Sequence, residues 1–141
     1  DIEIASFAKK IAENYNRTSD LTVDIQDASI QISDSYLQVI VQELVDNAFK
    51  FSSEGTDVSV IGNCDEKEYC LTITDHGQGM HPEQLANFGE YIKFEKKLYV
   101  QQGTGLGMAI AKRLVELHGG KLMIESVPYE QTEIKVFLPL V

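Results

Sequence analysis

Three polar side chains between residues 43 and 50 have the types and the spacing to hold a metal–phosphate complex. Glu43 and Asn47 are four residues apart and Lys50 follows three residues later, so a helix would place them along one line. An amide oxygen can ligate Mg²⁺, a carboxylate can orient metal-bound water, and a lysine can neutralise phosphate charge. The alternative is an ordinary solvated helix face, where such spacings are common.

A second group of residues would suit a purine base. Asp75 ends the apolar run 71–74, and Gly77 and Gly79 follow it. A carboxylate at the end of a strand can accept a hydrogen bond from the exocyclic amine of adenine, whereas guanine presents a carbonyl there. The glycines permit close approach of a planar ligand, and Met80 would line the pocket with a soft apolar side chain. A plain Asp turn is the alternative.

A third stretch, rich in glycine, opens a predicted helix. Its residues are Gly103, Thr104, Gly105, Leu106 and Gly107. Free backbone N–H groups at the beginning of a helix favour phosphate, and the helix dipole adds to this preference. The stretch is not a Rossmann turn, because no strand directly precedes it. It is not a Walker loop either, because no Gly-Lys-Ser/Thr sequence follows it. A flexible hinge is the alternative.

These residues must be positioned by a mixture of helices and strands. Apolar spacing predicts three main helices, and Ser33 or Asp34 would cap the second of them; the helices span 1–16, 34–51 and 106–117. A short helix is predicted from Pro82 to residue 88, and a loop from 89 to 103. Alternation predicts strands over 21–25, 29–32, 57–63, 69–74, 121–126 and 132–138. Because strict βα alternation is missing, we expect an α/β two-layer sandwich with helices on one face of a mixed sheet.

Length and charge narrow the classes of function. The chain has 141 residues, which suits a single domain, 1–141. Its net charge of −10 argues against a nucleic-acid binder and against docking on an anionic membrane. No apolar run is long enough for a membrane span and no signal peptide is visible, which favours a cytoplasmic setting. Because the chain begins with Asp1, we expect a segment of a longer protein.

Cys64 and Cys70 flank a turn, but two cysteines are too few for a disulfide framework.

The order of the three motifs resembles the ATP-binding catalytic domain of bacterial sensor histidine kinases, in the superfamily with gyrase, HSP90 and MutL. Residues 43–51 (ELVDNAFKF) are similar to the N box, 75–79 (DHGQG) to the G1 box and 103–107 (GTGLG) to the G2 box. The similarity extends from about residue 20 to the end of the chain. It implies a Bergerat-type fold, with a mostly antiparallel sheet of about five strands and three main helices on one face.

The resemblance also implies the cofactors ATP and Mg²⁺ and a role for each motif. Asn47 would bind Mg²⁺, with Glu43 at the upstream metal-side position, and Lys50 would contact phosphate. Phe51 would pack on adenine, and Asp75 would accept from its amine. The other positions that would line the nucleotide site are Gly77, Gly79, Met80, Phe94, Gly103, Thr104, Gly105, Leu106, Gly107 and Thr132.

Two positions depart from the family pattern. Lys96 stands where the family often carries a phosphate-facing arginine, and a lysine lacks the planar fork of that side chain. Gln131 replaces the glycine that usually precedes Thr132. We still expect Lys96 to take part in catalysis together with Glu43, Asn47 and Lys50.

The implied activity is transfer of the ATP γ-phosphoryl group to a histidine on a separate dimerisation domain of the same parent protein, which is absent from this chain. His76, His81 and His118 lack the His-acid-x-x-x-Pro setting of that acceptor. A downstream response regulator is the further implied partner, and neither nucleic acid nor direct membrane contact is expected. The alternatives are a serine kinase of the anti-sigma-factor type and a non-catalytic, nucleotide-dependent binding module.

Overall fold

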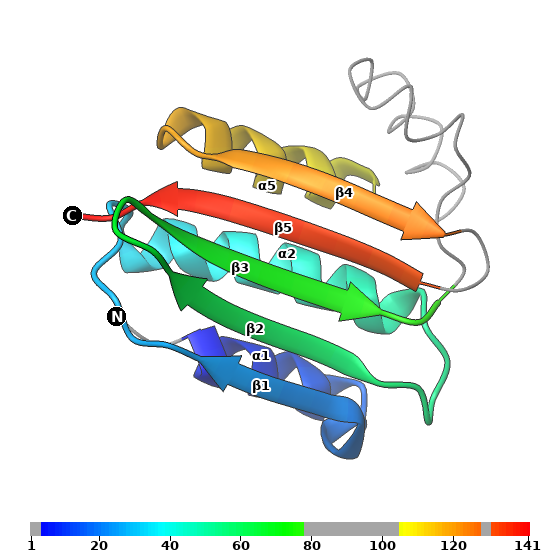
Figure 1. Cartoon of the computed structure of the whole chain (residues 1–141). Coiled ribbons are helices and arrows are strands. Elements are labelled where there is room, and N and C mark those ends of the chain that lie inside the picture. Colours follow the sequence, from blue (N-terminus) through cyan, green and yellow to red (C-terminus); the bar gives the residue numbers. More distant parts are fainter. Residues whose placement is uncertain (1–3, 78–104, 128–130) are drawn as a thin grey trace.

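The structure, a computed structural model, describes residues 4–77, 105–127 and 131–141. The described residues form two layers, an open five-stranded sheet and three α-helices that cover one of its faces (Figure 1). The elements are α1 (Ile4–Asn14), a 3-10 turn (Thr18–Asp20), β1 (Leu21–Ile25), α2 (Asp34–Lys50), β2 (Val58–Cys64), β3 (Glu68–Asp75), α5 (Gly105–Leu117), β4 (Lys121–Val127) and β5 (Gln131–Pro139).

The sheet has the strand order β1-β2-β3-β5-β4. β1 runs parallel to β2, and the other three pairs are antiparallel. The predicted two-layer α/β sandwich, with a mixed and mostly antiparallel sheet and the helices on one face, is therefore confirmed. None of the helices in the described part of the chain is long and apolar enough to cross a membrane.

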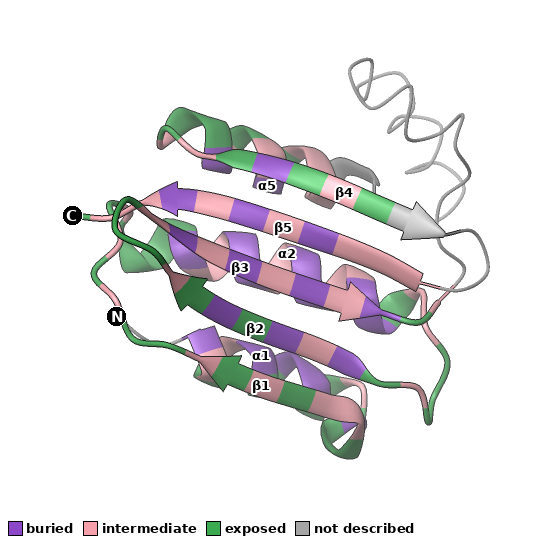
Figure 2. Cartoon of the chain, in the orientation of Figure 1, coloured by how far each residue is buried: buried purple, intermediate pink, exposed green. Residues whose placement is uncertain are grey.

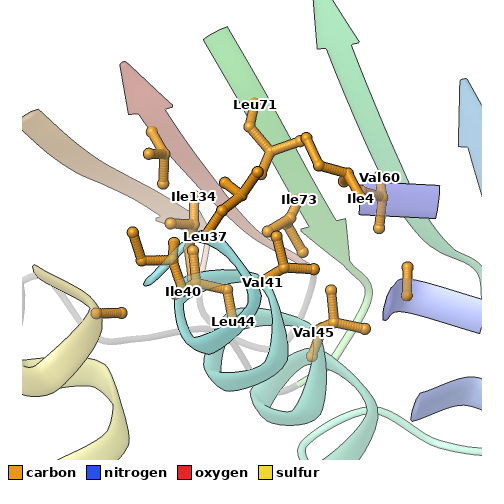
Figure 3. Packing of buried hydrophobic residues seen from close by; sticks show 14 of the residues in the cluster. Ile4, Leu37, Ile40, Val41, Leu44, Val45, Val60, Leu71, Ile73 and Ile134 are labelled. Carbon is orange, nitrogen blue, oxygen red and sulfur yellow. The ribbon is translucent and has the colours of Figure 1, made fainter. Parts of the chain in front are cut away.

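α2 is the central helix of the covering layer, and its local sequence sets both of its ends. Ser33 is the N-cap, and its hydroxyl accepts from the backbone N–H of Tyr36 at 3.4 Å. Asp34 in the first turn and Lys50 in the last complement the helix dipole. Figure 3 shows the apolar side of α2 facing the sheet, where it meets residues of the strands. The labelled residues of this cluster are Ile4, Leu37, Ile40, Val41, Leu44, Val45, Val60, Leu71, Ile73 and Ile134.

The alternation of side chains along β3 explains why the carboxyl group of Asp75 is buried. Alternate residues of this strand point toward the helices, and Tyr69, Leu71 and Ile73 are buried there (Figure 2). Asp75 is the next residue of that alternation and is only 7% exposed. The strand therefore carries a carboxyl group to the helix-covered side of the sheet at its last position.

The predicted strand over 29–32 is wrong. Only Ile30 pairs, in an isolated bridge with Leu140. Both edges of β5 are occupied, by β3 and β4, so this segment reaches only the residues at the end of β5. The predicted helix over 82–88 and the predicted loop over 89–103 lie outside the described residues.

The two cysteines lie on neighbouring strands but on opposite faces of the sheet. Cys64 is directly opposite Tyr69 in the β2–β3 register, whereas Cys70 is opposite Asn63. Directly opposed residues share a face and successive residues alternate, so the two thiols point away from each other. Both cysteines are free.

Candidate functional site

The ends of two helices and two strands lie on one side of the molecule. In Figure 1 the C-terminal ends of α2 and β3 and the N-terminal ends of α5 and β5 all lie at the right of the view. Thr132 is the direct partner of Asp75 in the β3–β5 register. The described parts of all three motifs are therefore positioned by one edge of the fold.

The N-terminal turn of α5 contacts the line of polar side chains on α2 that Glu43, Asn47 and Lys50 form. A Cβ atom added at Gly107 would collide with the Oε1 atom of Glu43. Glu43 is half-buried, and burial raises the pKa of its carboxyl group, with a smaller contribution from the negative charge of Asp46. This contact shows that Glu43 does not lie on an ordinary solvated helix face, and any side chain at residue 107 would force the Glu43 carboxylate to move.

Asn47 and Lys50 continue the same line toward the end of α2. Asn47 is half-buried and Lys50 is exposed. The backbone carbonyl of Asn47 accepts from the N–H of Phe51 at 3.1 Å, which caps the helix. The two side chains are therefore presented at the end where β3 finishes.

Asp75 is held by a tight turn that also requires glycine. Its Oδ1 atom accepts from the backbone N–H of Gly77 at 2.8 Å. A Cβ atom at Gly77 would collide with the carbonyl oxygen of Phe51 and would lie 3.0 Å from Oδ1 of Asp75. The end of α2 and the turn after β3 are thus in direct contact, and any side chain at residue 77 would separate them.

Burial gives Asp75 an unusual protonation equilibrium. Desolvation raises the pKa of its carboxyl group to about 6, although the Gly77 N–H and the positive charges of His76 and Arg17 act in the opposite direction. An ionised carboxylate here is poorly solvated. A ligand that donates a hydrogen bond, such as an exocyclic amine, would compensate for that loss.

These groups fit an adenine nucleotide with Mg²⁺. The buried carboxylate suits the base, and the two glycines let the Asp75 turn approach Phe51 and the first turn of α5 approach Glu43. The side chains along α2 provide one carboxylate, one amide and one ammonium group. The carboxylate and amide oxygens suit a metal ion, and the ammonium group suits phosphate. The N-terminal turn of α5 lies beside them and can favour an anion.

Several predicted site residues have no described geometry. Gly79, Met80, Phe94, Lys96, Gly103 and Thr104 lie outside the described residues. Gly105 and Leu106 are described as the backbone of the first turn of α5.

The sequence analysis missed Tyr15 and Arg17, which both contact α2. The hydroxyl group of Tyr15 donates to Asp46 at 2.7 Å, and Arg17 donates to the backbone carbonyl of Phe49 at 2.9 Å. The only local signal is Asp20, three residues after Arg17, and such a pair looks like an ordinary surface ion pair.

Comparison with known proteins identifies the family. The profile described as "Histidine kinase-, DNA gyrase B-, and HSP90-like ATPase" matches residues 32–141. The chain belongs to this ATPase family. The resemblance to the ATP-binding domain of sensor histidine kinases is thereby confirmed.

Its similar proteins are sensor kinases. Sensor histidine kinase YcbM of Bacillus subtilis is 32% identical over 120 residues, which are 82% of this chain and 39% of that protein. Heme sensor protein HssS of Staphylococcus saprophyticus is 34% identical over 131 residues, 89% of this chain and 28% of that protein. Among solved structures, the mycobacterial sensor histidine kinase MprB superposes with a TM-score of 0.70 at 27% identity, covering 97% of this chain and 93% of that one. The chain thus spans well under half of the length of these two curated relatives.

Proposed function

We propose that this ATPase-family domain binds Mg²⁺·ATP and delivers the γ-phosphoryl group to a histidine on a dimerisation domain of the same parent protein. The observation that carries the proposal is the convergence of Glu43, Gly107 and the Asp75 turn at one edge of the fold. Family membership and the names of the similar proteins support the same assignment.

Each described residue has a role in this proposal. Asp75 accepts from the adenine amine and so orients the base. Asn47 and Glu43 hold Mg²⁺, which neutralises phosphate charge when bound. Lys50 and the N-terminal turn of α5 provide further positive potential for the phosphates. Catalysis is then mainly positioning and charge neutralisation, as is usual for phosphoryl transfer.

The remaining predicted residues are proposed to complete the site. Phe51 and Thr132 line the base side, where they adjoin Gly77 and Asp75 respectively. Lys96 is proposed to contact the phosphates. The other proposed lining residues are Gly79, Met80, Phe94, Gly103, Thr104, Gly105 and Leu106.

We also infer the setting in which the domain works. Chain 1–141 is one catalytic unit, its phosphoacceptor is a separate domain, and a response regulator receives the phosphoryl group. Cytoplasmic ATP and response regulators place such a unit in the cytoplasm. The domain on its own is expected to turn over little ATP unless a phosphoacceptor domain is added.

Titration calorimetry with ADP, with and without Mg²⁺, tests the nucleotide site. Asn47→Ala is expected to abolish the gain in affinity from Mg²⁺ and to weaken Mg²⁺·ADP binding about tenfold or more, because the amide ligand is lost. Asn63→Ala, at an exposed position on β2, is the matched control and is expected to bind as the wild type does. Equal affinity of Asn47→Ala and wild type would refute the metal assignment.

The chemistry of the product tests the phosphoryl transfer. The domain is mixed with radiolabelled ATP and a purified dimerisation domain of a sensor kinase that contains its histidine. Label that is lost in acid and kept in base indicates phosphohistidine, the expected result. Acid-stable label would indicate a serine kinase, and nucleotide binding with no transfer would favour a binding module.

A further inference from the structure

Arg17 is, with Asp75, one of the two polar side chains that are buried in the described part of the chain. It follows α1 in sequence, and its side chain is 5% exposed. Its guanidinium carbon lies 4.9 Å from the centre of the Phe49 ring, on α2. A buried cation at this place needs partners, and α2 and the turn after it provide them.

The guanidinium group of Arg17 binds the end of α2 and the following turn through four backbone carbonyls. Nη1 donates to Phe49 at 2.9 Å and to Ser52 at 3.1 Å. Nη2 donates to Ser53 at 2.8 Å and to Thr56 at 3.2 Å. The last carbonyls of a helix lack partners within the helix and carry its negative dipole end, so a planar cation satisfies them well.

Asp20 fixes the orientation of this guanidinium group. Its Oδ2 atom accepts from Nε of Arg17 at 2.7 Å and from the backbone N–H of Gly55 at 3.0 Å. Arg17 and Asp20 together therefore hold the turn from Ser52 to Thr56 against the chain that follows α1.

The segment that Arg17 holds is the one that adjoins the nucleotide site. It brackets Phe51, whose carbonyl packs on Gly77, and Gly77 donates to Asp75 at 2.8 Å. The positive charge of Arg17 also acts on Asp75 directly and lowers the pKa of that carboxyl group against the effect of burial. Arg17 is thus linked to Asp75 both through packing and through its charge.

We propose that Arg17 is a positioning residue of the nucleotide site: it holds the end of α2 against the Asp75 turn in the arrangement that binds adenine. The inference rests on the proposed function. A role in folding alone would end at satisfying these carbonyls, because removing a buried cation leaves its acceptors without a hydrogen bond and destabilises the fold. A positioning role also changes nucleotide affinity and its pH dependence. An apolar replacement would lack the hydrogen bonds from the guanidinium group to the four carbonyls and the positive charge near Asp75.

ADP affinity as a function of pH tests this proposal. Two substitutions separate the effect of the charge from that of the hydrogen bonds. Arg17→Met removes both the positive charge and the planar guanidinium group that donates to the four carbonyls. Arg17→Lys keeps a positive charge but loses the planar group. Arg17→Met is expected to weaken ADP binding about tenfold at pH 7 and to move the pH midpoint of binding upward, because the charge of Arg17 then no longer opposes the effect of burial on the pKa of Asp75. Arg17→Lys is expected to weaken binding with little change in the midpoint. Arg113→Met, at an exposed position on α5, is the matched control.

The outcomes distinguish this inference from the function on which it rests. If wild type fails to bind ADP, the proposed function is wrong. If wild type binds and folded Arg17→Met binds equally well with the same pH midpoint, Arg17 has only a structural role and the inference is wrong. Should Arg17→Met not fold, Asp20→Asn decides: a loss of ADP affinity in the folded protein supports the inference, and wild-type affinity overturns it.

Discussion

At the scale of single residues, Asp75 is a group that the fold holds at a cost. Its pKa is raised from 3.8 to about 6, so the folded chain binds the proton more tightly than the unfolded chain does. The free energy of unfolding therefore decreases as pH rises from about 4 to about 6, and the full cost of the ionised carboxylate applies at pH 7. Functional sites commonly contain groups of this kind.

Asp75→Asn is expected to remove this pH dependence. Relative to wild type, the variant should gain about 2 to 3 kcal/mol in the free energy of unfolding between pH 4 and pH 7, at 1.36 kcal/mol for each pKa unit. The Asn side-chain oxygen can still accept from Gly77, so the turn is kept. Urea unfolding at several pH values measures the difference. A difference that stays constant over this pH range would show that the carboxyl group of Asp75 has an ordinary pKa.

The same substitution is expected to weaken nucleotide binding. An amide presents its NH₂ group where the carboxylate would present an acceptor to the adenine amine, so ADP affinity at pH 7.5 should decrease by about tenfold or more. Titration calorimetry with ADP measures this, and circular dichroism checks that the fold is retained. Unchanged ADP affinity would contradict the role of Asp75 in binding adenine.

At the scale of secondary-structure elements, the contact between α2 and α5 depends on the missing side chain of Gly107. An added methyl group would meet the carboxylate of Glu43, which must then move or push the first turn of α5 away. Gly107→Ala is therefore expected to weaken Mg²⁺·ADP binding severalfold, although alanine favours a helix by about 1 kcal/mol. Calorimetry measures the affinity, and thermal unfolding reports the stability.

A double-mutant cycle gives the control for Gly107→Ala. In a Glu43→Ala background the collision is removed, so the same glycine substitution should stabilise the domain through its helix propensity alone. An equal effect of Gly107→Ala in both backgrounds would mean that Glu43 and Gly107 are not coupled.

At the scale of the whole molecule, a nucleotide that binds only the folded state must stabilise it. Mg²⁺·ADP at a hundred times its Kd should add about 2.7 kcal/mol. That corresponds to a rise in Tm on the order of 10 °C for a domain of this size. Scanning calorimetry with Mg²⁺·ADP measures the shift, and adding a chelator of Mg²⁺ should reverse most of it. No shift at saturating nucleotide would contradict nucleotide binding to the folded chain.

Local sequence patterns predict the elements well. α2 and α5 lie where apolar spacing and terminal residues place them, and β3 lies where alternation places it. These features depend on residues within a few positions of one another, which is why they can be predicted. The strand over 29–32 is not formed because its neighbour β5 already pairs with β3 and β4 on its two sides, which no local pattern reveals.

The types of the candidate site residues follow from the sequence alone, whereas their environments follow only from the fold. The line of Glu43, Asn47 and Lys50, the Asp-Gly turn at residues 75–77 and the glycine-rich stretch 103–107 can be recognised from spacing. The burial of Asp75, the contact of Gly107 with Glu43 and the fork of Arg17 cannot, because each joins distant parts of the chain. Arg17, for instance, binds carbonyls 32 to 39 positions away. Desolvation and steric exclusion depend on which surfaces meet, and only the packing of the helices on the sheet decides that.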